Sequence, residues 1–122
     1  MQYMLLIYND ETQEPKLGDP RRTALFQAYG EFTEGIRKSG NFVAGAPLQP
    51  TATATTVRLR DGKRLVTDGP FAETREQLGG YFLIEAANLD EALDVAGQIP
   101  GAKKGTVEVR PIMEITGLPG QK

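Results

Sequence analysis

Six consecutive apolar residues, "YMLLIY" at positions 3–8, constrain the fold of this chain more than any other feature. The run lacks the alternation of apolar and polar residues found in a half-exposed strand, so it predicts a central strand covered on both faces. With 122 residues, the chain is long enough to bury one core without disulfide bonds. We therefore expect a single domain over residues 1–122, with a frayed end at 117–122.

Two amphipathic segments predict helices. Asp19 can accept hydrogen bonds from exposed amides at a helix start, and Pro20 fits the first helical position. Asn88, with Glu91 three residues later, is a similar start signal for the second helix. The apolar positions are Leu25, Tyr29, Phe32 and Ile36 in the first segment, and Leu89, Ala92, Leu93, Ala96 and Ile99 in the second. Each helix therefore has one apolar stripe to bury.

Further strands are predicted between the two helices and after the second one. The segment 41–50 reads as an edge strand, because its two prolines cannot donate to a ladder. Residues 55–70 form a hairpin around Asp61-Gly62, and "GGYFLIEA" at 79–86 is the next strand. The last strand is expected over 106–115, with alternating side chains on its two faces. One face holds Val107, Val109, Pro111, Met113 and Ile115, and the other holds Glu108, Arg110, Ile112 and Glu114.

The order of these elements predicts an α+β, ferredoxin-like fold. Strand, helix and strand come first, a β-hairpin is inserted, and a second strand, helix and strand follow, which is the split βαβ plan. Both helices then cover one face of an antiparallel sheet. In the runs at 3–8 and 81–86, the odd-numbered and the even-numbered positions both include apolar residues. The face of the sheet that the helices leave uncovered is therefore apolar as well. Such a face needs a partner, and we predict a homodimer with the sheets packed face to face.

The composition excludes several classes of site and partner. The chain has no Cys and no His, which removes thiolate chemistry, Cys-based metal sites and the usual proton shuttle at neutral pH. Its 14 basic and 16 acidic side chains give a net charge of −2, which does not favour nucleic-acid binding. No apolar window approaches the roughly 18 residues of a membrane span. We expect a cytoplasmic protein with no cofactor, no metal, no nucleic-acid partner and no membrane partner.

The segment "TDGPFAETREQLGGYFLIEAANLDEALDVAGQIP", together with the opening "MQYMLLIYND" and the hairpin, resembles the DGPF-type proteins of the YCII-related family. That family is similar in fold to dimeric α+β barrels, which include muconolactone isomerases and small-molecule monooxygenases. In shorter YCII-type relatives, a His and an Asp on the first helix are regarded as a possible acid–base pair. Their places fall near Tyr29 and Lys38 here, and the absence of His means that this pair cannot operate. Genes for sigma factors often lie beside those of DGPF-type proteins, which implies a possible transcription-regulator partner.

The loop "DGPFAETREQLGG" at 68–80 carries most of the candidate site residues. Asp68 and Glu73 are candidate catalytic bases, and Arg75 could bind an anionic group. Turn statistics favour Asp68 as a turn former before a glycine over Asp68 as a base. The charges of the loop either line a pocket or form a solvated cluster worth at most about 1 kcal/mol. Phe71 is either a plug for the loop or a ligand-stacking side chain.

Other features of the loop have structural interpretations. Thr74 and Gln77 match a capping box, which predicts a possible helical turn. Gly79-Gly80 is followed by a strand rather than a helix, so the pair indicates a bulge or a close backbone approach rather than a phosphate site.

Two further ligand-binding candidates come from the strands. Tyr8 could donate its phenol hydroxyl to a ligand or fill the core with the hydroxyl at its edge. Arg110 could bind an anion or bridge neighbouring acids. The resulting hypothesis is a small-molecule-binding homodimer. If it is an enzyme, it is of the isomerase or lyase type and uses carboxylate acid–base chemistry. The alternative is a non-catalytic interaction or sensor module linked to transcription regulation.

Overall fold

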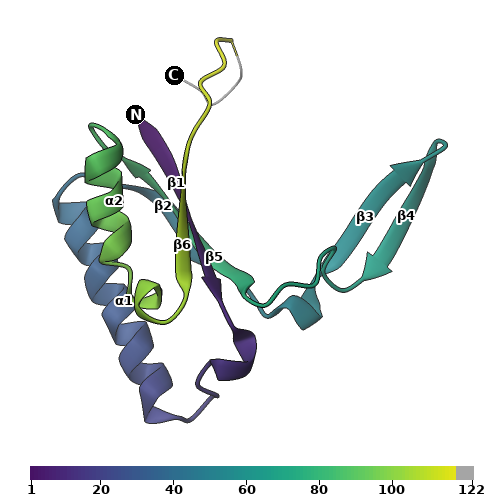
Figure 1. The fold of residues 1–122 in the computed structure, drawn as a ribbon, viewed down its shortest axis with the longest axis horizontal. Helices are drawn as coiled ribbons and strands as arrows, with labels where there is room; N and C mark the ends of the chain where they lie inside the picture. The colour runs from purple at the N-terminus through teal and green to yellow at the C-terminus, as the bar shows by residue number, and fades with distance from the viewer. Residues whose placement is uncertain (118–122) are drawn as a thin grey trace.

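A computed structural model describes residues 1–117, and its main body is a four-stranded antiparallel sheet with two helices on one face (Figure 1). The elements follow the predicted order, and the sheet order β2-β5-β1-β6 is that of the ferredoxin-like fold. The strands are β1 (Gln2–Asn9), β2 (Phe42–Pro47), β3 (Thr55–Arg60), β4 (Lys63–Asp68), β5 (Gln77–Glu85) and β6 (Thr106–Pro111). The helices are α1 (Pro20–Lys38) and α2 (Leu89–Gly97), with short 3-10 turns η1 (Glu11–Gln13), η2 (Thr51–Thr53) and η3 (Pro100–Lys103).

The predicted helix starts are confirmed by their hydrogen bonds. The amide of Arg21 donates to Asp19 Oδ1 at 2.9 Å, and Pro20 occupies the first position of α1. At α2, the amide of Glu91 donates to Asn88 Oδ1 at 2.9 Å, while Glu91 accepts from the amide of Ala87 at 2.6 Å. Both caps satisfy amides that a helix leaves without internal partners. None of the helices within residues 1–117 is long and apolar enough to cross a membrane.

The core lies between the sheet and the two helices. Every second residue of β1 and β5 points into it, as the period of a strand requires. Its buried members are Tyr3, Leu5, Ile7, Phe32, Ile36, Phe82, Ile84, Ala86, Ala92, Val95, Ala96 and Ile99. On α2 the expected stripe is partly wrong, because Leu89 and Leu93 are exposed and Val95 takes their place. The helix is rotated so that Ala92, Val95 and Ala96 face the sheet, and the small alanines let it pack closely.

The last strand is shorter than predicted. β6 ends at Pro111, opposite Tyr3 of β1, and the amide of Ile112 makes one more bond to Gln2 O at 2.9 Å. The partner strand begins at Gln2, so the ladder between β1 and β6 cannot continue past Ile112. Met113 is accordingly 74% exposed rather than part of a buried face. Apart from Gly117, the predicted frayed end lies outside the described residues.

Within residues 1–117, no helix lies on the other face of the sheet. Antiparallel register places Met4 beside Leu83, and Leu6 beside Tyr81, all on this open face. Each of these four residues is partly exposed. We refer to this surface, formed by alternate residues of β1, β2, β5 and β6, as the open face. The predicted apolar character of both faces is therefore present in the structure.

The β3–β4 hairpin stands apart from the body as an arm (Figure 1). Its turn is the predicted one, since Asp61 and Gly62 have φ angles of 51° and 75° and two positive values suit a tight hairpin turn. The two strands form a separate two-stranded sheet. The arm projects from the side of the body opposite the helices, which is also the side of the open face (Figure 1).

Candidate functional site

The loop from Asp68 to Gly80 joins the arm to the body, and its first part belongs to the arm. The amide of Gly69 donates to Ala54 O at 2.7 Å, and Thr56 Oγ1 donates to Gly69 O at 2.8 Å. Gly69 has a φ of +104°, a conformation that favours glycine. Asp68 is exposed at the end of β4, and its carboxylate accepts no hydrogen bond from the part of the chain that is described. The turn therefore depends on Gly69 rather than on the side chain of Asp68.

The second part of the loop is fastened to the body. Thr106 Oγ1 donates to Glu76 Oε1 at 2.8 Å, and the amide of Glu11 donates to Gln77 Oε1 at 2.9 Å. Gln77 also donates to Thr74 O at 2.6 Å, but residues 75–76 are a bend and not a helical turn, so the predicted helical turn is wrong. The bonds to η1 and β6 hold the chain extended instead of letting it coil.

Glu73 and Arg75 lie exposed on this loop. Arg75 is near enough to Asp10 to affect its ionisation. The pKa of Asp10 is held below its ordinary value first by the hydrogen bonds from the hydroxyl and amide of Thr12, and to a smaller degree by the charge of Arg75. Neither Glu73 nor Arg75 makes a side-chain hydrogen bond or ion pair within residues 1–117.

The glycine pair at the start of β5 forms the predicted bulge. Ile7 pairs with Gly80 while Tyr8 pairs with Leu78, so Gly79 is the extra residue in the ladder. A side chain at Gly80 would place its Cβ 3.1 Å from Ala46 O, which explains the need for glycine where β2 approaches. The bulge lies beside Tyr8, at the end of the sheet nearest the arm.

A polar cluster lies on the open face where β1 meets β6. Tyr8 Oη donates to Glu108 Oε1 at a long 3.4 Å. Arg110 is two residues further along β6, so its side chain emerges on the same face as Glu108, opposite Met4. Glu108 and Arg110 are exposed and Tyr8 is partly buried. This polar cluster presents a phenol and a carboxylate joined by a hydrogen bond, with a guanidinium two residues further along β6. It lies at the edge of the apolar strip formed by Met4, Leu6, Tyr81 and Leu83.

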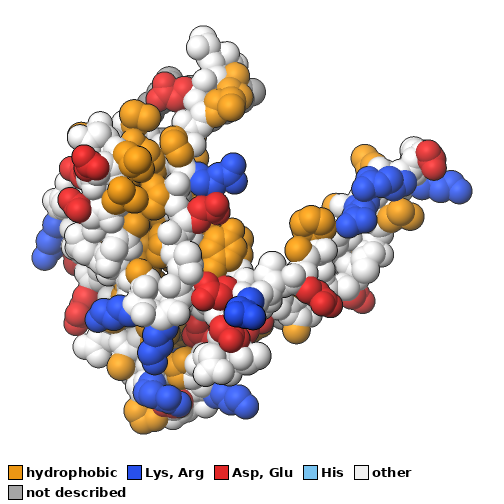
Figure 2. Space-filling view, in the orientation of Figure 1, with side chains coloured by type: hydrophobic (Ala, Val, Ile, Leu, Met, Phe, Trp, Pro, Cys, Tyr) orange, Lys and Arg blue, Asp and Glu red, His pale blue; other side chains and the backbone are white. Residues whose placement is uncertain are grey.

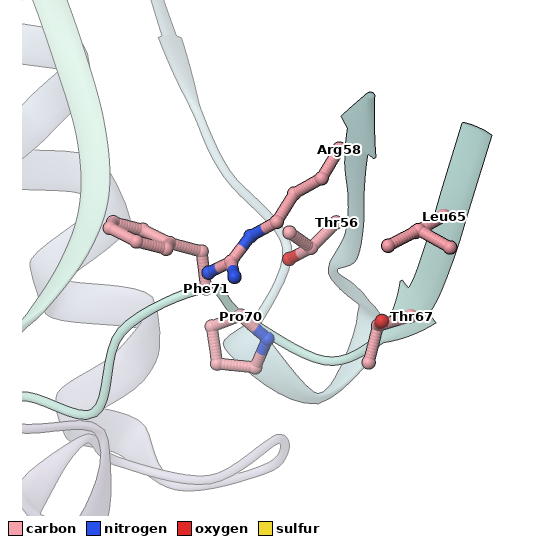
Figure 3. Close-up of a pocket in the computed structure, with 6 residues that line it drawn as sticks. All are labelled: Thr56, Arg58, Leu65, Thr67, Pro70 and Phe71. Carbon is pink, nitrogen blue, oxygen red and sulfur yellow. The ribbon is translucent and has the colours of Figure 1, made fainter. Parts of the chain in front are cut away.

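A groove of about 270 Å³ lies at the foot of the arm (Figure 3). It is lined by Thr56, Arg58, Leu65, Thr67, Pro70 and Phe71. The guanidinium of Arg58 lies 5.7 Å from the centre of the Phe71 ring, within the range of a cation–π contact. Phe71 is 75% exposed, so it does not plug the loop. A groove with one cation, one aromatic ring and two hydroxyls can hold a flat, anionic or polar group.

The six predicted site residues therefore fall into three places. Tyr8 and Arg110 share the open face, Phe71 borders the groove, and Asp68, Glu73 and Arg75 are exposed on the loop between. Sequence reasoning missed Arg58. The hairpin register around Asp61-Gly62 places Arg58 beside Leu65 and so could have identified its face, but not its contact with Phe71.

Tyr29 stands near the place where YCII-type relatives have the His discussed above. Its hydroxyl accepts a hydrogen bond from the amide of Gly101 at 3.1 Å, and burial raises its pKa. The residue thus joins α1 to η3 and has a structural role. Within residues 1–117, no three Asp or Glu side chains lie together in a group that could hold a metal ion.

Comparisons with known proteins agree with the fold. The chain is 39% identical over 114 residues, covering 92% of both chains, to an uncharacterised protein of Rhizobium meliloti (strain 1021). It is also similar to the solved structure of 5-chloro-2-hydroxyhydroquinone dehydrochlorinase (TftG) from Burkholderia phenoliruptrix AC1100 in complex with 2,5-dihydroxybenzoquinone. That match has a TM-score of 0.51 and 14% identity, and it covers 93% of this chain and 95% of the other, so it shows a shared fold. The YCII-related domain matches residues 1–116, and the chain belongs to this family.

Proposed function

We propose that this protein is a homodimer that binds a small organic molecule between the open face of its sheet and the second copy. The observation that carries the proposal is the polar cluster of Tyr8, Glu108 and Arg110 beside an apolar strip. Ligand sites commonly combine an apolar surface with a few polar groups that fix orientation. The dehydrochlorinase of the same fold was solved with a hydroxylated quinone bound, which supports a small planar ligand here.

The chemistry that fits this cluster is proton transfer without a cofactor. Arg110 would bind an oxyanion of the ligand, Tyr8 would donate a hydrogen bond, and a carboxylate would act as base. Glu108 is the carboxylate nearest Tyr8. Asp68 and Glu73 remain predictions for the same role, and both need a second copy or a ligand to cover them, because each is exposed in the single chain.

A non-catalytic interaction or sensor role is the alternative. It is favoured by the exposure of Asp68, Glu73 and Arg75, since charged loop side chains in solvent suit contact with a protein partner. A transcription regulator is the partner class that the family resemblance implies. The cytoplasmic location also remains a prediction.

The test is a thermal-shift screen with 2,5-dihydroxybenzoquinone and other small hydroxylated aromatic anions. Saturation at about 100 times the dissociation constant stabilises a protein by about 2.7 kcal/mol. We expect the stabilisation to be lost in Arg110→Ala and reduced in Tyr8→Phe. Lys104→Ala removes an exposed cation that lies in the connection before β6, and it should leave the shift unchanged.

Two outcomes would count against the proposal. One is an equal shift in Arg110→Ala and wild type, which would place the ligand elsewhere. The other is the absence of any stabilising compound, which would favour the interaction role. Asp68→Asn and Arg75→Ala, tested alongside, show whether the loop takes part: a lost shift in both variants would place the ligand against it.

A further inference from the structure

We propose that the β3–β4 arm of each copy docks against the body of the other copy in the homodimer. The inference rests on the homodimer proposed above and adds to it. The open face brings the copies together, and the arms then clasp the partner. The open space between arm and sheet is where the second copy lies (Figure 2).

The arm lacks what a hairpin needs to be stable alone. A two-stranded hairpin in water is marginal at best unless another layer packs on it. One face of the arm carries Val57, Leu59 and Val66, which are 61%, 69% and 57% exposed. Val57 and Leu59 alternate with Arg58 and Arg60, as they would in a strand with a buried face. The pattern is that of a packed hairpin, but the single chain supplies nothing to pack on it within residues 1–117.

The direction of the arm identifies the second copy as the occupant. The helices lie on one side of the four-stranded sheet, and the arm projects on the other, alongside the open face (Figure 1). A second copy that packs its sheet on the open face therefore reaches the arm as well. Two-fold symmetry makes the contact reciprocal, because each arm then lies beside the body of the other copy.

The charges of arm and body are complementary. Residues 55–68 carry four basic and two acidic side chains, while the whole chain carries 14 and 16. The remainder thus has 10 basic and 14 acidic side chains. The arm is net positive and the body net negative, so an arm attracts the body of another copy. Of the arm's cations, Arg58 is held near Phe71 and the others are exposed near the tip.

The arm can be removed with little disturbance to the body. The residues that flank the arm, Ala54 and Gly69, are joined by a hydrogen bond of 2.7 Å from the amide of Gly69 to Ala54 O. The two ends of the arm therefore lie side by side, just beyond the last strand pair. Replacing residues 55–68 by Asn-Gly closes the chain with a two-residue turn. The core contains no residue of this segment, and circular dichroism would check that the body still folds.

Sedimentation equilibrium of the full chain and its variants tests the inference. We expect a dimeric wild type. Removal of the arm should weaken dimerisation at least about tenfold, the factor that burial of a single aliphatic side chain supplies. Leu59→Asp should weaken it comparably without altering the fold. Leu17→Asp is the matched control, since Leu17 is 89% exposed in the connection before α1 and should change nothing.

The outcomes separate this inference from the proposed homodimer. If wild type is dimeric and neither arm variant changes the dissociation constant, the arm does not dock and only this inference is overturned. If wild type is monomeric at all concentrations, the homodimer fails and the arm contact with it. Should the excised chain not fold, Leu59→Asp against Leu17→Asp still decides the question.

Discussion

The body and the arm are built from the same kind of strand, but they differ in what stabilises them. In the body, β1 and β5 each have a strand on both sides and a layer of helices on one face. In the arm, β3 and β4 pair only with each other within residues 1–117. Phe82 packs edge-to-face against Phe32 with ring centres 5.1 Å apart, whereas Leu59 of the arm is exposed. The body thus contains its own core, whereas the apolar side chains of the arm are left exposed within residues 1–117.

This difference shows that alternation in a sequence identifies a strand without identifying its cover. Val57 and Leu59 alternate with polar residues just as core-facing positions do. Whether such positions are buried depends on the next layer, which can come from the same chain or from another. The following changes test the comparison in order of expected effect.

Truncation of a core side chain should separate the two regions most clearly. Ile84 is fully buried in β5, so Ile84→Ala should lower the free energy of unfolding by about 2–5 kcal/mol. Leu65→Ala in the arm should change it by no more than about 0.5 kcal/mol in dilute, monomeric protein. Urea denaturation measures both. Equal losses would show that the arm has a core of its own.

Two glycines give a second comparison. A Cβ at Gly105 would collide with Tyr8 O and come within 2.7 Å of Asn9 Oδ1, so Gly105→Ala should destabilise the body by about 1–3 kcal/mol. Gly62 has open space but a φ of +75°, so Gly62→Ala strains only the turn of the arm, by about 1–2 kcal/mol. Thermal unfolding of the monomer should therefore shift for Gly105→Ala and stay in place for Gly62→Ala. A larger shift for Gly62→Ala would mean that arm and body unfold together.

The smallest effect concerns pH. The side chain of Arg21, and then its amide, donate hydrogen bonds to Asp19 and hold the pKa of that carboxyl below its ordinary value of 3.8. The carboxylate therefore stabilises the fold above about pH 3.8, and this contribution is lost as pH falls through the lowered pKa. Asp19→Asn keeps a capping side chain but should flatten the fall in melting temperature below that pH.

Asp68→Asn in the arm is the control at neutral pH. The Asp68 carboxylate accepts no hydrogen bond from residues 1–117, so this substitution should leave the melting temperature as in wild type. A lower melting temperature would show that Asp68 has a partner in the assembled protein.

Much of the fold could be predicted because its signals are local. Asp19-Pro20 and Asn88 start helices through hydrogen bonds to nearby amides, and Asp61-Gly62 closes a hairpin through its own φ angles. Errors arose where distant parts decide. Leu89 is exposed because the rotation of α2 depends on how alanines fit the sheet, and the last strand stops where β1 has no residue left to pair.

The candidate site was harder to predict for the same reason. Arg110 could be assigned to the face of Glu108 from alternation along the last strand, but the unbroken apolar run at 3–8 does not assign Tyr8 to a face. That assignment needs the register of β1 against β6. Glu73 and Arg75 could not be placed, because the direction of an irregular loop depends on bonds such as those of Glu76 to Thr106. Arg58 was missed because its partner, Phe71, follows a turn whose course depends on Gly69.

Amide hydrogen exchange, measured at protein concentrations above and below the dimer dissociation constant, tests the central claim most directly. Local exchange reports the free energy of opening each segment. We predict that amides of β3 and β4 are protected in the dimer and lose protection on dilution, while the amide of Ile84 stays protected at both concentrations. Protection of the arm that does not change with concentration, whether high or low, would contradict the claim that the arm depends on a second copy.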